Sequence, residues 1–244
     1  MVTRGLPPPP GAGGTSVDVV TGGPFYRVLS IVLSPLLRLL LRPRVHGVAN
    51  IPAQGPFIVA SNHLSFTDSF VISPLIRRRV VYLTKSYYFE LPGRAGRFIR
   101  WGLTMLGNVP IRCGPQRAAL RALEEAAGVL AAGGVVAIYP EGTRSTDGLL
   151  YRGRTGVGWL ALNSGVPVLP VGLEGTDRIL PTGGRFPRLH VRPTIRIGEP
   201  MDFSRYRDLH PAAARRVITD EIMETIRKLS GQEYTGRYNP RADA

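Results

Sequence analysis

Residues 116–139 read QRAALRALEEAAGVLAAGGVVAIY and predict a helix that is followed at once by a strand. Alanine, leucine and glutamate dominate residues 116–132, and the pair Gly133-Gly134 directly after them is typical of a helix end. Residues 135–139 are rich in β-branched side chains, which favours a buried strand. A helix joined to a strand by a short glycine turn is typical of α/β folds.

The same alternation of strands and helices runs through most of the chain. We expect further strands at residues 57–60, 80–84, 109–111, 166–172 and 191–197, and further helices at residues 67–76, 94–106, 157–164 and 212–229. This order predicts an α/β fold with a single, largely parallel sheet flanked by helices. Proline cannot donate to a sheet ladder, so Pro167 and Pro170 predict an edge strand or a bulge at residues 166–172.

Composition divides the chain into four parts. Residues 1–24 are rich in glycine and proline and predict a disordered tail. Residues 25–43 predict a separate helix, residues 44–232 one catalytic domain, and residues 233–244 a C-terminal tail. The beginning of the chain lacks the basic-then-apolar pattern of a signal peptide, so we expect the protein on the cytoplasmic side of the membrane.

The helix predicted at residues 25–43 is amphipathic. Its polar residues fall within one arc of about 120° at about 100° per residue, and they are Arg27, Ser30, Ser34, Arg38 and Arg42. The apolar run at 25–41 is shorter than the ~20 residues that cross a bilayer. We therefore expect a membrane-interfacial helix on the cytoplasmic face of the cell membrane, peripheral or monotopic, with its arginines toward anionic lipid. Packing of this helix on the domain core is the alternative.

The chain is strongly basic. Its 244 residues include 31 Lys and Arg against 17 Asp and Glu, which gives a formal net charge of +14. Lys85 and Lys228 are the only lysines, and arginine binds phosphate through paired hydrogen bonds. The charge predicts an anionic partner, which is nucleic acid, an anionic membrane surface or a phosphorylated substrate. The single Cys113 excludes an internal disulfide and a cysteine zinc cluster, and the spacing of the histidines indicates no metal site.

Functional sites of parallel sheets form where strands end, and residues 62–68, NHLSFTD, follow the predicted strand at 57–60. Residues five apart on one helix lie about 140° apart, so His63 meets Asp68 only if the histidine is in the loop and the aspartate in the first helical turn. The capping-box form of residues 65–68 favours this. An aspartate bonded to one imidazole nitrogen leaves the other as a general base. The alternative is a cap residue beside an ordinary loop histidine.

A second polar loop, residues 139–145 with the sequence YPEGTRS, comes at the end of the strand predicted at residues 135–139. Gly142 allows close approach of the backbone, Thr143 is a neutral donor, and Arg144 suits a phosphate monoester. Glu141 is expected to hold Arg144 or to contact a substrate hydroxyl. The alternative is a surface turn with a solvated Arg–Glu pair.

Three of these stretches resemble the glycerolipid acyltransferases of the lysophosphatidic acid acyltransferase family. Asn62-His63-x4-Asp68 resembles the first signature of that family, residues 139–145 its third, and residues 166–171, VPVLPV, its fourth. The similarity runs from about residue 25 to residue 198 and implies a glycerol-3-phosphate acyltransferase-like fold. Residues 198–234 also resemble actinobacterial members, which the arginine-rich composition favours.

The resemblance implies a reaction. His63, oriented by Asp68, is expected to deprotonate a hydroxyl of 1-acyl-sn-glycerol 3-phosphate, which attacks the thioester of acyl-CoA or acyl carrier protein. The product is phosphatidic acid, a step of phospholipid biosynthesis, and no cofactor is expected beyond the donor substrate. The substrate-binding residues that the resemblance implies are Asn62, Lys85, Arg112, Glu141, Gly142, Thr143 and Arg144. Lys85 is expected as a second phosphate contact; its alternative is a strand-end charge that points to solvent.

The second signature departs from the family pattern. Residues 107–113 read GNVPIRC, with Arg112 where an acid is common and Cys113 where an arginine is expected. Either Arg112 reaches the phosphate from one position earlier, or the acceptor differs. Such an acceptor is glycerol 3-phosphate acylated at its sn-2 hydroxyl, another lysolipid or a glycolipid.

Two further interpretations use the same residues differently. Ser65 or Ser69 acts as a nucleophile with His63 and Asp68 in a hydrolase or a ping-pong transferase. A non-catalytic protein that binds anionic lipid or RNA through its charge is the alternative from another class. The two ordered polar loops have no function in such a binder, so nucleic acid is the least expected partner.

Overall fold

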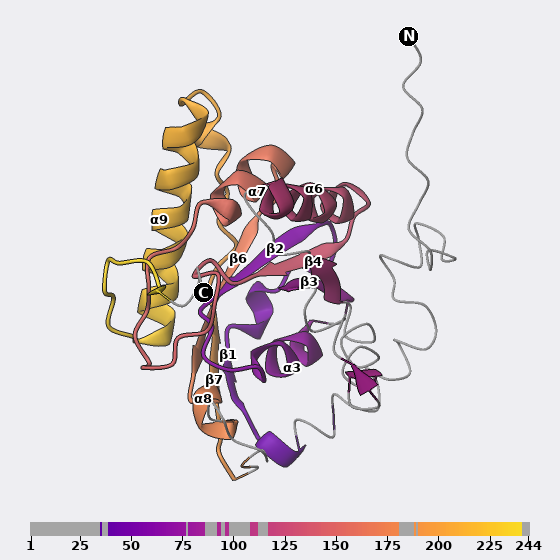
Figure 1. Cartoon of the computed structure of the whole chain (residues 1–244), viewed down its shortest axis with the longest axis vertical. Helices are drawn as coiled ribbons and strands as arrows, with labels where there is room; N and C mark the ends of the chain where they lie inside the picture. The colour runs from indigo at the N-terminus through magenta and orange to yellow at the C-terminus, as the bar shows by residue number, and fades with distance from the viewer. Residues whose placement is uncertain are drawn as a thin grey trace.

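Seven strands of the described residues form one sheet in the order β1-β7-β6-β2-β5-β3-β4, as Figure 1 shows. The computed structural model describes residues 39–76, 78–85, 108–111, 117–180 and 190–240, together with positions 35, 92, 93, 96, 97 and 188. The tail predicted at 1–24, nearly all of the interfacial helix and most of the helix predicted at 94–106 lie outside these residues. Within the described part, no helix has both the length and the apolar character that crossing a bilayer requires.

The sheet is largely parallel, as the alternation of elements predicts. Every pair of neighbouring strands is parallel except β6 and β7, which are antiparallel. The strands are β1 (Arg44–His46), β2 (Phe57–Ser61), β3 (Val80–Lys85), β4 (Asn108–Ile111), β5 (Val135–Ile138), β6 (Val168–Glu174) and β7 (Thr194–Ile197). The short edge strand β1 was not expected from the sequence, because three residues are too few to show a pattern.

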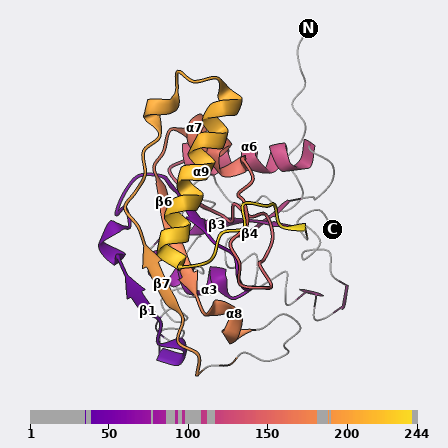
Figure 2. The same cartoon turned by 90° about the vertical axis from the view of Figure 1, so that its left-hand side faces the viewer.

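Helices cover both faces of the sheet, as Figures 1 and 2 show. The α-helices are α3 (Asp68–Ile72), α6 (Arg117–Ala131), α7 (Gly156–Ser164), α8 (Thr176–Ile179) and α9 (Pro211–Ser230), and the 3₁₀ helices are η1 (Val48–Asn50), η2 (Ser73–Leu75) and η3 (Ser204–Tyr206). The helix predicted at 67–76 divides into α3 and η2, because Pro74 in the first turn of η2 has no backbone donor.

Strand β2 lies inside the sheet, and all five of its residues are buried. Successive side chains of a strand point to opposite faces. Phe57 and Val59 accordingly pack in the cluster that contains Val71 and Ile72 of α3. The next residues along β2 pack in a second cluster with α6, α7 and α9, which contains Ile58, Ala60, Leu130, Leu160 and Ile222. Burial on both faces explains why this strand is a continuous apolar run.

The prediction of an edge position for the proline-containing strand is wrong, whereas a bulge is present. Strand β6 lies between β2 and β7. Val168 pairs with Met201 and Val171 with Ile197, so the segment opposite β6 carries one extra residue between these pairs. Pro170 lies at this bulge, where its carbonyl accepts from the backbone of Gly198 and no ladder donor is required of it.

Helices α7 and α9 are in close contact at Gly158, where there is no room for a side chain. A Cβ at this position would lie 2.2 Å from the carbonyl oxygen of Arg215 and 2.7 Å from Oγ1 of Thr219. Both of these atoms belong to α9. Helix α9 packs on the same face of the sheet as α7, with Ile222 in the cluster that contains Ile58 and Leu160.

Gly158→Ala is therefore expected to lower the free energy of unfolding by about 1–3 kcal/mol, the usual cost of overpacking. Gly128→Ala is the matched control, since a Cβ at Gly128 in α6 meets nothing within 4 Å. Alanine is the better helix former, so the control should gain about 0.5–1 kcal/mol. Urea denaturation of both variants measures the difference, and equal changes in the two would contradict the close approach.

Candidate active site

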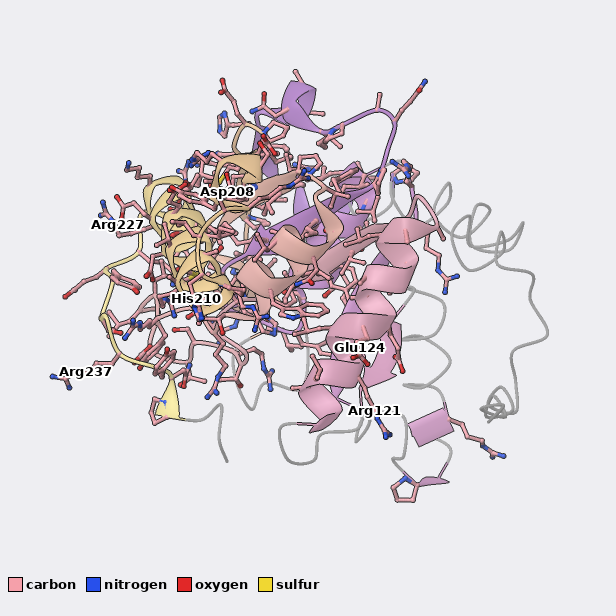
Figure 3. The ribbon with its side chains drawn as sticks, turned by 90° about the horizontal axis from the view of Figure 1, so that it is seen from above. Arg121, Glu124, Asp208, His210, Arg227 and Arg237 are labelled. Atoms are coloured by element: carbon pink, nitrogen blue, oxygen red, sulfur yellow. The ribbon has the colours of Figure 1, made fainter. Side chains whose placement is uncertain are left out.

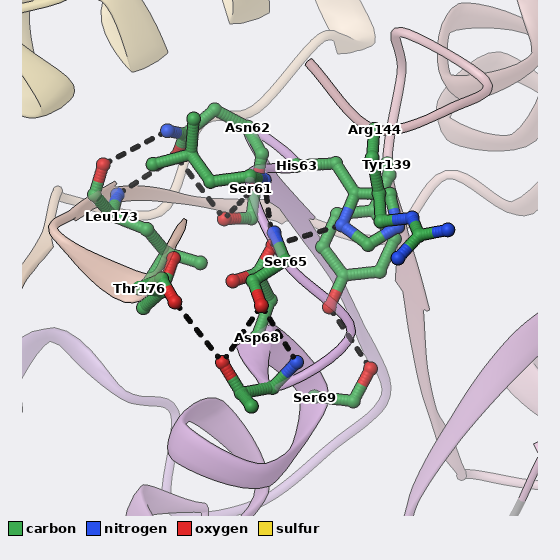
Figure 4. A network of polar contacts seen from close by, with 12 residues as sticks. Ser61, Asn62, His63, Ser65, Asp68, Ser69, Tyr139, Arg144, Leu173 and Thr176 are labelled. Atoms are coloured by element: carbon green, nitrogen blue, oxygen red, sulfur yellow. Dashed lines mark hydrogen bonds and ion pairs between the residues drawn. The ribbon is translucent and has the colours of Figure 1, made fainter. Parts of the chain in front are cut away.

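Two loops leave the carboxyl edge of the sheet side by side. Strand β2 ends at Ser61 and β5 at Ile138, and the two strands are parallel neighbours. Residues 62–68 and 139–145 therefore start at the same edge. The backbone N–H of Ser145 donates to the carbonyl of His63 at 2.8 Å and joins the two loops. Figure 4 shows this part of the structure.

The pair predicted from spacing is formed. His63 lies in the loop, Asp68 is the first residue of α3, and Nδ1 of His63 is 2.8 Å from Oδ2 of Asp68. The aspartate side chain is fully buried, and that of the histidine is 18% exposed. Among the described residues, no hydrogen bond occupies Nε2 of His63. A carboxylate on Nδ1 favours the tautomer with its proton there, so Nε2 is left to accept a proton.

The buried carboxylate of Asp68 is held by more than the histidine. Its Oδ2 also accepts from the backbone N–H groups of Leu64 at 2.7 Å and Ser65 at 2.9 Å. These donors compensate part of the cost of burying the charge, and Oδ1 is buried with no hydrogen-bond partner among the described residues. A capping box has two hydrogen bonds, and the one from the backbone N–H of Ser65 to the carboxylate of Asp68 is formed. The hydroxyl of Ser65 instead accepts from Thr67, so α3 begins at Asp68.

The ring of Tyr139 supports the imidazole from one side. The centroids of the two rings are 3.9 Å apart and their planes differ by 10°. Burial raises the pKa of the Tyr139 hydroxyl well above its usual value, so the phenol is neutral, and it bonds to Oγ of Ser69 at 3.0 Å. No role for Tyr139 was predicted from the sequence. Tyr139 directly follows Ile138, which pairs in register with Ala60 of β2. Knowledge of this register would have placed Tyr139 next to the loop that carries His63.

Glu141 does not have the role expected from the sequence, which was to hold Arg144 or to contact substrate. Its carboxylate is buried, with Oε1 accepting from the backbone N–H of His63 and Oε2 from that of Tyr151, both at 3.0 Å. The side chain therefore links its own loop to the backbone at His63 and at Tyr151. Burial raises the pKa of Glu141 to about 7, although the two backbone donors lower it.

Asn62, expected to bind substrate, is also committed inside the protein. Its side chain is buried and pairs with the backbone of Leu173 in β6, donating to the carbonyl at 2.9 Å and accepting from the N–H at 2.7 Å. Its amide also donates to Oε1 of Gln232 at 2.7 Å. These contacts use the amide to hold the start of the loop that carries His63, so the buried side chain has a structural role in this part of the structure.

Arg144 and its neighbours remain candidates for binding an anion. Gly142 has a φ of 79°, which favours glycine, and its N–H donates to the carbonyl of Tyr139 to close a turn. Thr143 and Arg144 are half-buried. Arg144 precedes Ser145, whose backbone N–H donates to the carbonyl of His63, so Arg144 and His63 lie in adjoining loops (Figure 4). The guanidinium of Arg144 makes no ion pair with any residue that the structure describes.

The other two predicted cations are placed only in part. Lys85 is the last residue of β3 and pairs in register with Ile111 of β4, so its backbone lies at the carboxyl edge of the sheet. Arg112 lies outside the described residues. In the described part of the chain, no three or more His, Cys, Asp or Glu are grouped as metal ligands are.

Comparison with known families agrees with this arrangement. The family model described as Acyltransferase matches residues 42–174, which is more than half of the chain and includes both site loops. The chain belongs to the acyltransferase family. The acyltransferase carries His63 and Arg144 inside the matched range, whereas α9 and the residues after it lie beyond that range.

The acyltransferase is also similar to proteins of stated activity. It is 28% identical to the 1-acyl-sn-glycerophosphate (LPA) acyltransferase PlsC from Thermotoga maritima, with a TM-score of 0.57 over 86% of this chain and 90% of that one. A chloroplastic 1-acyl-sn-glycerol-3-phosphate acyltransferase of Brassica napus is 31% identical over 73% of this chain and 50% of the relative. One from Borreliella burgdorferi is 26% identical over 75% and 70%. The chain spans about half the length of the plant relatives that it matches.

The raised pKa of Glu141 makes the stability of the acyltransferase depend on pH. Between about 4.5 and 7 the folded state keeps a proton that the unfolded chain releases. The protonated Glu141 therefore contributes its full stabilisation below pH 4.5. As the pH rises through 7, the free energy of unfolding falls by up to about 3 kcal/mol. Glu141→Gln cannot titrate, and its missing acceptor costs the same at every pH.

The unfolding free energy of the wild type minus that of Glu141→Gln should consequently fall between pH 5 and pH 8. Urea denaturation of both proteins at several pH values gives this difference, in which the titration of all other groups cancels. A constant difference across this interval would show that Glu141 titrates alike in the folded and unfolded chains.

Proposed function

We propose that this protein transfers an acyl group from acyl-CoA or acyl carrier protein to the free hydroxyl of 1-acyl-sn-glycerol 3-phosphate and so makes phosphatidic acid. The observation that carries the proposal is the His63–Asp68 pair in a loop that is hydrogen-bonded to the loop of Arg144 at one edge of the sheet. The stated activities of the bacterial and plant relatives support the choice of acceptor.

The geometry supports His63 as the base of a direct transfer. Nε2 takes the proton of the acceptor hydroxyl, and the hydroxyl oxygen attacks the carbonyl carbon of the thioester. The resulting C–O bond replaces the C–S bond, and the thiolate that leaves takes the proton back from His63. Asp68 keeps Nδ1 occupied throughout and stabilises the imidazolium that forms in between.

Arg144 is suited to the phosphate of the acceptor. A guanidinium without an acidic partner among the described residues can bind a phosphate monoester through two parallel, charge-assisted hydrogen bonds. Glu141 is turned away into the interior, so its charge does not compete for this guanidinium. Lys85 at the end of β3 and Arg112 after β4 are further candidates for the same phosphate.

The hydrogen bonds of the nearby serines disfavour a covalent acyl-enzyme. Ser65 is buried and its hydroxyl donates to the carbonyl of Leu180 at 3.2 Å. Ser69 bonds to the hydroxyl of Tyr139 at 3.0 Å. A nucleophilic serine has to present its hydroxyl to Nε2 of the histidine, and both hydroxyls have other partners here.

His63→Ala is expected to lower kcat by about 10²–10⁴-fold, which is the usual contribution of a general base. His210→Ala is the matched control, since His210 is exposed at the start of α9 (Figure 3) and should leave kcat unchanged. Release of CoA from palmitoyl-CoA with lysophosphatidic acid as acceptor measures the rate. Circular dichroism shows that the variant is folded, and a folded His63→Ala protein with near-normal kcat would refute the assignment.

The same proposal places the enzyme at the cytoplasmic surface of a membrane. Its support is the amphipathic pattern of residues 25–42, the net charge of +14, and the exposure of Leu39 (65%) and Leu40 (39%) in the described part of that stretch. Arginines beside exposed leucines suit an interface between anionic headgroups and acyl chains.

Binding to vesicles tests this location. The protein should sediment with phosphatidylglycerol vesicles, less with phosphatidylcholine vesicles, and less at high salt, because salt screens the attraction of exposed charges. Leu39→Glu should weaken binding without loss of structure. RNA binding at physiological salt is the comparison, and stronger binding to RNA than to anionic vesicles would contradict the membrane assignment.

A further inference from the structure

The chain after α9 returns to the site loop. Gly231 ends α9 with a φ of 73°, and the segment at residues 232–239 then pairs with the loop that follows Arg144. Leu150 donates to the carbonyl of Glu233 at 2.8 Å and accepts from the N–H of Thr235 at 3.0 Å. A tail is predicted from residue 233 onward, whereas residues 233–239 make hydrogen bonds to the domain. Figure 2 shows the segment in yellow.

Gln232 connects the two loops of the site. Its Oε1 accepts from Nδ2 of Asn62, the residue before His63, at 2.7 Å. Its Nε2 donates to the carbonyl of Gly148, four residues after Arg144, at 2.7 Å. One side chain therefore fixes the spacing between the loop of the predicted base and the loop of the predicted phosphate ligand.

Asn239 holds the backbone of Arg144 itself. Its Nδ2 donates to the carbonyl of Arg144 at 3.3 Å, and the residue is only 3% exposed. A buried amide in the last described turn of the chain is costly unless its hydrogen bonds are made. The contact holds the backbone carbonyl of Arg144 in the loop.

We infer that residues 232–239 are a positioning segment, in which Asn239 sets Arg144 and Gln232 keeps the two site loops at a fixed spacing. The inference rests on the proposed function for the role of Arg144. It adds residues that lie beyond the range 42–174 matched by the family model. The family match alone therefore omits side chains on which the geometry of the site depends.

A double-mutant cycle tests whether Asn239 acts through Arg144. Arg144→Ala is expected to raise the KM for lysophosphatidic acid and to lower kcat/KM strongly, because a charge-assisted contact is lost. Asn239→Ala should raise the same KM about three- to tenfold, with kcat within about twofold. The double variant should be no worse than Arg144→Ala, since residues that act through one contact are not additive. Arg121→Ala is the control, because that side chain is exposed on α6, outside the segment and outside both site loops (Figure 3).

The two failures are distinct. A KM unchanged by Arg144→Ala would refute the phosphate contact of the proposed function, whatever Asn239→Ala does. A raised KM in Arg144→Ala with a normal KM in Asn239→Ala, or effects that multiply in the double variant, would overturn the positioning role alone.

A second measurement does not depend on activity. Gln232→Leu removes both side-chain bonds, so amide exchange of Leu150 and Arg152, whose N–H groups donate to the segment, should become faster. Exchange in α6 should stay as in the wild type. Unchanged exchange at Leu150 and Arg152 would show that Gln232 does not hold the segment on the loop.

Discussion

The buried carboxylate of Asp68 determines how the site is built. A charge in so dry a place is tolerated only if donors surround it, and Oδ2 accepts from the His63 ring and from the N–H groups of Leu64 and Ser65. All of these donors lie within residues 63–65, so the loop has to wrap around the first turn of α3. The position of the imidazole follows from this wrapping, and Tyr139 closes its other side.

The parallel pairing of β2 and β5 brings the second loop to this histidine. Because both strands end at the same edge, the backbone bond from Ser145 to His63 and the side-chain contact of Glu141 with the N–H of His63 join residues 62–68 with residues 139–145. Asn62 ties the first loop to Leu173 of β6, and Gln232 and Asn239 of the segment at residues 232–239 bond to Asn62, Gly148 and Arg144. Polar side chains of both loops are thus divided between those that hold the backbone and those that are left for substrate, chiefly His63 and Arg144.

Local sequence signals predicted the order of elements, the parallel sheet and the meeting of His63 with Asp68. What failed depended on contacts between distant parts of the chain. Glu141 and Asn62 have the polarity of substrate ligands, and only their burial and their backbone partners show that they are structural. The prolines of β6 indicated a bulge correctly, but the position of the strand in the sheet depends on β7, which is distant in the sequence. No local pattern marks residues 233–239 as part of the domain.

If Arg144 binds the phosphate of the acceptor, the site should acylate a hydroxyl of an acceptor that carries a phosphate monoester. The direct measurement is a product analysis of the purified protein with palmitoyl-CoA and an acceptor panel of lysophosphatidic acid, glycerol 3-phosphate, lysophosphatidylcholine and a glycolipid. Lysophosphatidic acid should give the highest kcat/KM, with phosphatidic acid as its product. Equal or faster acylation of lysophosphatidylcholine or of the glycolipid, neither of which offers a phosphate monoester to Arg144, would contradict this expectation.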